Sequence, residues 1–207
     1  IQSDARRISS MEAAQTLKRY GLKGVETTIA GPDEQTHDIL FDRGSYAEGI
    51  AGLARCREAG IEISINIPLH KGNYLTLVQT VISLQELKPR AVVFSLPDPA
   101  DLSAPELALS MQNAAEALRR TFAALRNDGI MENCTLAYSG LPPCMLPDFG
   151  EYNSDLVAAE SVEISEVADS AFAAYAFPER LHVEECAGCR HGGECPGPYA
   201  TAQDQHT

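Results

Sequence analysis

The chain has 207 residues, of which 44 % are hydrophobic, so it can bury a core and form one domain with an appendage. Its formal net charge of −13 at pH 7 argues against non-specific binding to nucleic acid or anionic lipid, which needs a basic surface. No apolar run approaches the length of a membrane span and no secretory signal is evident, so we expect a cytoplasmic protein with no membrane partner.

Hydrophobic spacing predicts alternating strands and helices over the first 140 residues. Residues 1–5 read as a strand end entering a loop, so we expect a further N-terminal part before them. Ser9, Ser45 and Ser103 are each followed three residues later by Glu, the capping-box pattern that begins a helix. Helices are predicted near residues 10–20, 33–40, 45–59, 75–87 and 103–126, and strands near residues 25–29, 61–67, 91–96 and 135–138.

This alternation predicts an α/β fold with parallel strands, because right-handed helical crossovers join parallel neighbours. The continuous apolar run over residues 91–96 is typical of a strand buried on both faces. The pattern fits a partial (β/α) barrel or an open sheet, and in both folds functional residues gather at the carboxyl ends of the strands. Five polar or apolar candidates follow or end these strands: Ser3, Asp4, Thr28, Asn66 and Leu96.

Four cysteines form the second candidate site. Cys186, Cys189 and Cys195 are separated by two and five residues and interleaved with glycines, whereas Cys144 lies in a rigid loop between prolines. Thiolates ligate zinc and the irons of iron–sulfur clusters, and both sites usually need four ligands. Because disulfides are rare in the cytoplasm, we predict a metal or cluster site on these four cysteines. Two further cysteines are expected to be small buried hydrophobic residues: Cys56 and Cys134.

The regular alternation ends near residue 150. The chain therefore divides into a barrel-type part, residues 1–143, and a small cysteine-rich extension, residues 144–207. Within the extension we expect a strand near residues 162–164 and a helix near residues 167–175.

Several short stretches follow one another in an order that a known family shares. They are residues 1–5, 25–32, 36–38, 44–46 and 61–66, then Asn73, and finally the four cysteines. In this order the chain resembles the radical S-adenosylmethionine enzymes over residues 1–199. The cysteines are similar to the auxiliary-cluster half of the SPASM/twitch-type C-terminal extensions of that family.

The resemblance implies the cofactors and their ligands. Ser3, Asp4, Thr28, Asn66 and Leu96 would hold S-adenosylmethionine, and the four cysteines would hold one auxiliary 4Fe–4S cluster. In the parent enzyme a reduced cluster would give one electron to the sulfonium, whose carbon–sulfur bond would break homolytically. The resulting 5′-deoxyadenosyl radical would abstract hydrogen from a small-molecule or peptide substrate, with an electron-donor protein as partner.

The chain departs from the family in two places. It has no Cys-x-x-x-Cys-x-x-Cys motif for the cluster that cleaves S-adenosylmethionine, which we expect in the preceding N-terminal part. This chain alone is therefore not expected to perform radical chemistry, and whether it is an enzyme stays open. Tyr199 stands where the full extension has a further cysteine, which limits the site to one auxiliary cluster.

Two alternatives remain. The same cysteines could hold zinc in a structural clasp, which would make the chain a non-catalytic α/β binding module. A conventional hydrolase or lyase could instead use His37 with Asp38, or His70 with Lys71, for acid–base catalysis.

Overall fold

The computed structural model describes residues 1–102, 104–127, 134–156 and 180–200. Its helices are α1 Met11–Arg19, α2 Glu34–His37, α3 Ser45–Glu58, α4 Leu77–Ser83 and α5 Met111–Asn127. Its strands are β1 Gly24–Thr28, β2 Glu62–Pro68, β3 Ala91–Ser95 and β4 Thr135–Ser139. The strand and helix expected near residues 162–164 and 167–175 lie outside the described residues.

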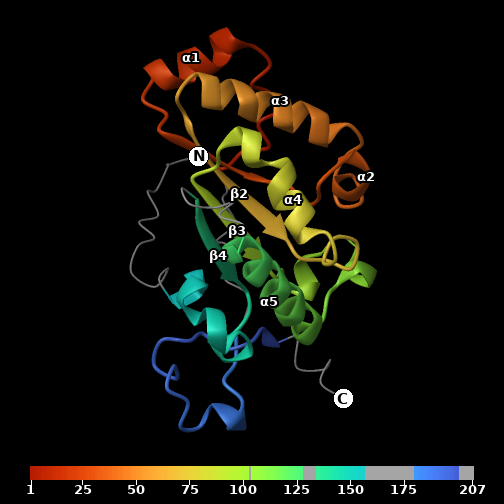
Figure 1. Ribbon diagram of the computed structural model, residues 1–207, viewed down its shortest axis with the longest axis vertical. Coiled ribbons are helices and arrows are strands. Elements are labelled where there is room, and N and C mark those ends of the chain that lie inside the picture. The colour runs from red at the N-terminus through yellow and green to blue at the C-terminus, as the bar shows by residue number, and fades with distance from the viewer. Residues whose placement is uncertain (103, 128–133, 157–179, 201–207) are drawn as a thin grey trace, which may run out of the picture.

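The four strands form one open, all-parallel sheet in the order β1-β2-β3-β4, which confirms the predicted α/β fold with parallel strands (Figure 1). The start of the chain adds to the β1 edge, because Gln2 forms a parallel bridge with Glu26. The amide of Ser3 donates to the carbonyl of Glu26 at 2.9 Å. The expected strand end at residues 1–5 is thus present as a single bridge beside β1.

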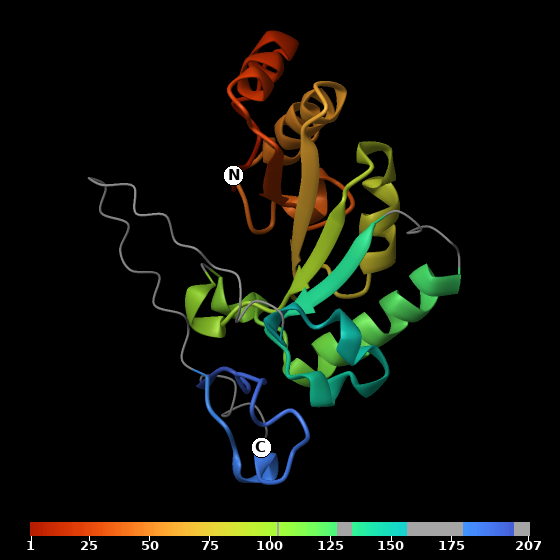
Figure 2. The same cartoon turned by 90° about the vertical axis from the view of Figure 1, so that its left-hand side faces the viewer.

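The two faces of the sheet differ. Helices α3, α4 and α5 lie against one face, where Ile65, Val92 and Phe94 are completely buried (Figure 2). On the opposite face Asn66 and Val93 are half-buried. The expectation that residues 91–96 would be buried on both faces is therefore wrong, because among the described elements no helix packs over the second face. Parallel sheets are normally covered on both faces.

An aromatic cluster joins the last helix to the segment after β4. Phe122 of α5 is 2 % exposed and meets Phe94 edge-on, with ring centroids 5.7 Å apart. The same ring packs against Phe149 and stacks on Tyr152, at centroid distances of 5.4 and 5.1 Å. Phe149 and Tyr152 belong to a 3₁₀ segment, Pro147–Tyr152, that follows the Cys144 loop, so burial of aromatic area fixes the end of that loop.

Two predicted helix starts are wrong. The helix expected from Ser103 begins at Met111, because residues 105–107 form a separate 3₁₀ turn, Pro105–Leu107. Lys71 draws that turn toward the loop after β2, since its amide donates to the carbonyl of Leu107 and its ammonium to the carbonyl of Glu106. The first helix is capped by Ser10, whose hydroxyl accepts from the amide of Ala13, and not by Ser9.

The helix predicted to be capped by Ser45 begins at that residue, and its N-cap is Gly44. Gly44 has no side chain that could accept a hydrogen bond at the start of the helix. Instead, the carboxylate of Asp38 accepts from the Gly44 amide at 2.8 Å. Within the described ranges, none of the helices combines the length and apolarity that crossing a membrane requires.

Candidate functional site

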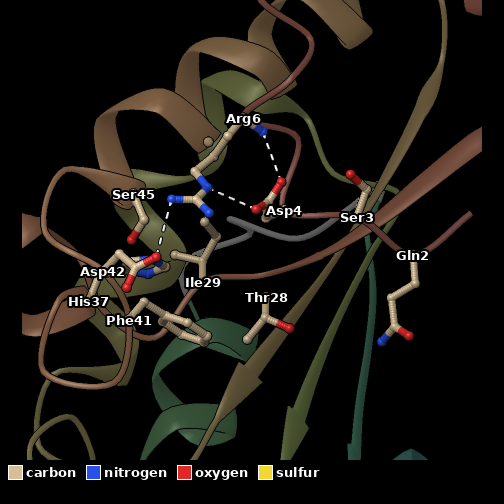
Figure 3. A pocket seen from close by; sticks show the side chains of 11 residues that line it. Gln2, Ser3, Asp4, Arg6, Thr28, Ile29, His37, Phe41, Asp42 and Ser45 are labelled. Atoms are coloured by element: carbon tan, nitrogen blue, oxygen red, sulfur yellow. Dashed lines mark hydrogen bonds and ion pairs between the residues drawn. The ribbon is translucent and has the colours of Figure 1, made fainter.

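A pocket of about 390 Å³ lies where the first residues of the chain meet the carboxyl end of β1 (Figure 3). Of the five predicted cofactor residues, Ser3, Asp4 and Thr28 line it. Further walls come from α2, from the loop after it and from the first turns of α3: His37, Phe41, Asp42, Ser45 and Gly49. The structure therefore brings together residues from three separate stretches at one carboxyl strand end, as the alternating pattern predicts.

The charged wall of this pocket is an ion-pair chain centred on Arg6. Its guanidinium donates to the Asp4 carboxylate at 2.8 Å and lies 3.6 Å from the Asp42 carboxylate (Figure 3). The hydrogen bond from Arg6 is the largest cause of a lowered pKa at Asp4, so that carboxyl stays ionised at neutral pH. Both acidic side chains are largely solvated, and the pairs orient the groups more than they stabilise the fold.

The turn that carries Asp4 depends on a close approach by α3. Ala5 is completely buried and has a φ of 60°, a left-handed conformation that is uncommon for residues other than glycine. Gly52 of α3 faces it, and a Cβ there would lie 2.1 Å from the Ala5 carbonyl oxygen. A Cβ on Gly49 would lie 3.2 Å from the Asp4 carbonyl oxygen. The absence of side chains at these two helix positions lets the turn sit against α3.

Asn66 and Leu96 occupy different positions from the other three cofactor candidates. Asn66 is paired in register with Thr28, so the two half-buried side chains lie side by side on the uncovered face of the sheet. Leu96 follows β3 and is 3 % exposed, as part of the hydrophobic core. Its amide donates to the carbonyl of Ser139. Leu96 therefore lies at the carboxyl ends of the strands, but it does not line the Arg6 pocket.

The two histidines of the acid–base alternative hold loops together. His37 is 4 % exposed, its Nδ1 accepts from the Ala30 amide at 3.0 Å, and burial lowers its pKa. His70 is completely buried, and its Nδ1 accepts from the Gly72 amide at 3.1 Å. Asp38, the neighbour of His37, accepts from a helix amide. These contacts indicate that the two histidines stabilise loops. They provide no evidence for an acid–base role.

The four predicted cysteine ligands line one cavity, although Cys144 is 42 to 51 residues away from the others in the chain. The cavity has a volume of about 270 Å³. It is lined by the Cys144 loop and by residues 180–200, which we call the cysteine segment. Figure 2 shows this segment beyond the carboxyl end of β4. The rest of the cavity wall is mostly apolar and includes Met111, Pro143, Met145, Val183 and Pro198, together with His182 and His191.

Backbone amides point at two of the four sulfurs. The amide of His191 donates to Sγ of Cys189 at 3.4 Å, and the amide of Gly197 donates to Sγ of Cys195 at 3.3 Å. In both cases the donor follows its cysteine by two residues. Such bonds favour the thiolate over the thiol and, in metal sites, tune the bound group. All six cysteines of the chain are free thiols, so none of these ligands is used in a disulfide.

The four thiols affect one another electrostatically. Loss of surrounding water is the largest cause of a raised pKa at Cys144, and negative charge on Cys195, Cys189 and Cys186 raises it further. Burial also raises the pKa of Cys195, and the amide of Gly197 partly opposes that shift. Four thiolates gathered in an apolar cavity repel one another, and a bound cation or cationic cluster relieves that repulsion.

The sulfurs do not form a ready-made site for a single ion. Among the described residues, no group of three or more His, Cys, Asp or Glu side chains is arranged so that it could hold one metal ion. Around one zinc ion, with zinc–sulfur bonds of about 2.3 Å, tetrahedral thiolates lie about 3.8 Å from one another. A 4Fe–4S cluster gives each thiolate its own iron, so its ligands stay farther apart.

Sequence reasoning missed three residues, two beside the cysteine cavity and one in the Arg6 pocket. Arg180 and Asp155 form an ion pair at 2.9 Å with 16 % of each side chain exposed, and Arg6 organises the other pocket. The spacing of the cysteines predicted the four ligands. No local sequence pattern connects Asp155 with Arg180, which follows it by 25 residues. The expectations for the other cysteines hold in part, because Cys56 is completely buried whereas Cys134 is half-buried just before β4.

No protein-family model matches the chain, and no curated protein matches it. The two pockets and their residues are therefore the basis for a functional assignment.

Proposed function

We propose that this chain is the carboxy-terminal part of a radical S-adenosylmethionine enzyme, carrying part of the S-adenosylmethionine site and one auxiliary 4Fe–4S cluster. The observation that carries the proposal is the shared cavity of Cys144, Cys186, Cys189 and Cys195 at the carboxyl end of a parallel sheet. In α/β folds this end is where ligands bind. A cluster there would relay electrons near the substrate of the parent enzyme.

The donor chemistry supports a cluster over a single metal ion. Four thiols, two backbone amides that donate to sulfur and a mostly apolar wall are the surroundings that iron–sulfur clusters use. Cys144 and Cys195 come from separate loops, so the group between them has to span the cavity. A zinc clasp uses the same ligands, and metal analysis separates the two.

The Arg6 pocket supports the S-adenosylmethionine part of the proposal. That cofactor carries an amino acid group with both an ammonium and a carboxylate. The ionised Asp4 suits an ammonium, and the hydroxyls of Ser3 and Thr28 suit a carboxylate or a ribose. Asn66 continues this polar row beside Thr28. Leu96 would supply backbone groups for the adenine from its place after β3, since its side chain is buried in the core.

The uncovered sheet face supports the partial barrel. Two rows of side chains cross that face from β1 to β4 and contain small or polar residues: Glu26, Ser64, Ala91 and Thr135, then Thr28, Asn66, Val93 and Ala137. Such a face suits the interior of a barrel that encloses cofactor and substrate. We propose that a preceding part of a longer chain supplies the remaining strands beside β1 and the motif for the catalytic cluster.

Ligand-by-ligand replacement tests the cluster assignment. After anaerobic reconstitution with iron and sulfide, the protein should show the broad absorbance near 400 nm that thiolate-to-iron charge transfer gives, with about four irons per chain. Cys186→Ala, Cys189→Ala and Cys195→Ala should each lose iron, and the double variant Cys189→Ala/Cys195→Ala, which keeps two of the four ligands, should lose most of the colour and iron. Cys134→Ala is the matched control, because this cysteine lies outside the cavity, and its iron content should equal that of the wild type.

Two outcomes would contradict the assignment. One is a colourless wild-type protein with one zinc per chain, which would turn the function toward a structural clasp in a binding module. The other is equal iron loss in Cys134→Ala and Cys189→Ala, which would place the iron outside the cavity. A separate assay tests the proposal that the catalytic cluster lies outside this chain. The reconstituted and reduced chain, given S-adenosylmethionine, should form no 5′-deoxyadenosine, because it lacks the Cys-x-x-x-Cys-x-x-Cys motif.

A further inference from the structure

The carboxylate of Asp155 links the cysteine segment to the Cys144 loop. Oδ2 of Asp155 accepts from the amide of Gly140 at 2.8 Å and from Nη1 of Arg180 at 2.9 Å. Gly140 begins the loop that carries Cys144, and Arg180 begins the segment that carries the other three cysteines. Asp155 therefore connects the two parts of the chain that form opposite walls of the cavity.

The Cys144 side of this connection is rigid. Gly140 has a φ of +81°, and a Cβ there would lie 2.1 Å from the Leu96 carbonyl oxygen, so the loop turns sharply against β3. Asn153 binds the same loop, because its side-chain amide donates to the carbonyl of Leu141 at 2.8 Å. The amide of Asp155 in turn donates to Oδ1 of Asn153 at 2.9 Å, which fixes the carboxylate relative to the loop.

The cysteine side of the connection converges on Arg180. Its guanidinium donates to the hydroxyl of Tyr199 at 3.1 Å and lies over the Tyr199 ring, with the central carbon 4.4 Å from the centroid. It also lies within 3.5 Å of the Gly197 carbonyl, and the Gly197 amide is the group that donates to Sγ of Cys195. An antiparallel bridge between Arg180 and Tyr199 closes the two ends of the segment.

We propose that Arg180 is the positioning residue that sets the three-cysteine segment opposite Cys144, through Asp155 and Tyr199. This inference rests on the proposed function for the identity of the bound group, but the positioning role itself holds for any group ligated by all four cysteines. A mostly buried ion pair whose arginine has several further contacts is geometrically specific in a way that an exposed pair is not. Tyr199, which occupies the place of a further cysteine, serves here as the platform for the guanidinium.

The proposal predicts loss of one specific ligand. Cys186, Cys189 and Cys195 share one loop, whereas the alignment of Cys144 with them depends on the Arg180–Asp155 connection. In Arg180→Gln the cluster should keep the three irons held by the loop and lose about one of four, because each thiolate binds its own iron. Electron paramagnetic resonance of the oxidised protein should then show a three-iron cluster, with the same spectrum as Cys144→Ala.

Two further variants act as controls. Arg190→Gln removes an exposed arginine of the same segment that contacts His191, and it should retain the wild-type iron content and spectrum. Arg180→Lys keeps the positive charge beside Asp155 but loses the planar group over Tyr199, so its iron content should lie between those of the wild type and Arg180→Gln. Circular dichroism of each variant should match that of the wild type, which separates misplacement of a ligand from loss of the fold.

The result that would overturn the proposal is an Arg180→Gln protein with the wild-type iron number and spectrum. Arg180→Lys with iron content as low as Arg180→Gln, and with the wild-type circular dichroism, would also overturn the role of the ion pair. If the wild type takes up zinc and no iron, the proposed function fails but the positioning role is still measurable. Arg180→Gln should then weaken zinc binding at least tenfold in competition with a chelator, whereas unchanged zinc affinity would refute the role.

Discussion

The sheet and the cysteine segment of this molecule are held in place by different forces. The sheet packs against α3, α4 and α5 through a continuous set of buried aliphatic and aromatic side chains. In the cysteine segment, among the residues whose burial is described, the buried ones are confined to its end: Gly197, Pro198 and Tyr199. An ion pair and loop hydrogen bonds hold the rest. A segment of this size cannot bury enough apolar surface to be stable alone, so the proposed cluster would add to its stability.

The largest effect on stability should come from the aromatic cluster of the sheet half. Phe122→Ala removes the ring that contacts Phe94, Phe149 and Tyr152, and it should lower the free energy of unfolding by about 3–5 kcal/mol, the usual cost of emptying a core aromatic site. Urea denaturation measures the change. Ile82→Ala is the control, because Ile82 is 45 % exposed on α4, and its cost should be within about 0.5 kcal/mol of zero. Equal costs for the two variants would show that this cluster is not the core.

Ligand binding should give the largest effect on the cysteine segment while leaving the sheet unchanged. Structural metal sites contribute about 10 kcal/mol or more to folding, so trypsin cleavage after the exposed Arg190 should slow by at least about 100-fold after cluster or metal loading. Cleavage after Arg43, an exposed site beside α3, should keep its rate. If loading protects both sites equally, or neither, the two regions do not differ in their dependence on the ligand.

A smaller effect should follow from closing the space between α3 and the Asp4 turn. Gly52→Ala places a Cβ 2.1 Å from the Ala5 carbonyl oxygen, and the resulting shift should cost about 1–3 kcal/mol. Gly49→Ala is the matched variant in the same helix, with a contact of 3.2 Å, and the better helix propensity of alanine should offset most of its cost. Thermal unfolding compares the two. A Gly52→Ala protein as stable as Gly49→Ala would show that the close approach is not required.

The smallest of these effects is a pH dependence confined to the sheet half. Burial lowers the pKa of His37, so the unfolded state binds its proton more readily than the folded state does. The contribution of neutral His37 to the free energy of unfolding is therefore present at neutral pH. It is lost as the pH falls below about 6.5, by no more than about 1.4 kcal/mol for each pH unit. His37→Gln keeps an acceptor for the Ala30 amide but does not titrate, so its unfolding free energy should fall less between pH 7 and pH 5.5. Identical slopes would contradict a role for His37.

The sequence was sufficient for the parallel α/β fold and for the set of cysteines that share a cavity. Hydrophobic period and strand length are local properties, and they predicted β1 to β4 within one or two residues of their ends. The spacing of Cys186, Cys189 and Cys195 and the prolines around Cys144 are also visible within short stretches of the sequence.

The errors and omissions concern contacts between distant residues. The capping pattern at Ser103 predicted a helix, but the backbone and ammonium of Lys71 draw residues 105–107 into a separate turn and delay α5 to Met111. The apolar run over residues 91–96 predicted a strand buried on both faces, because a sequence pattern does not reveal whether anything covers the second face. Arg180 and Asp155 carry no local signal, since a salt bridge between distant residues depends on the folded loops.

The most direct test of the central claim is the number of irons, inorganic sulfides and zinc ions bound by the wild-type chain after anaerobic reconstitution with both metals present. About four irons and four sulfides per chain, with no zinc, is the predicted result, because four cysteine ligands in one cavity suit a 4Fe–4S cluster. One zinc and no iron would contradict the cluster assignment and make the cysteine segment a structural clasp on an α/β module.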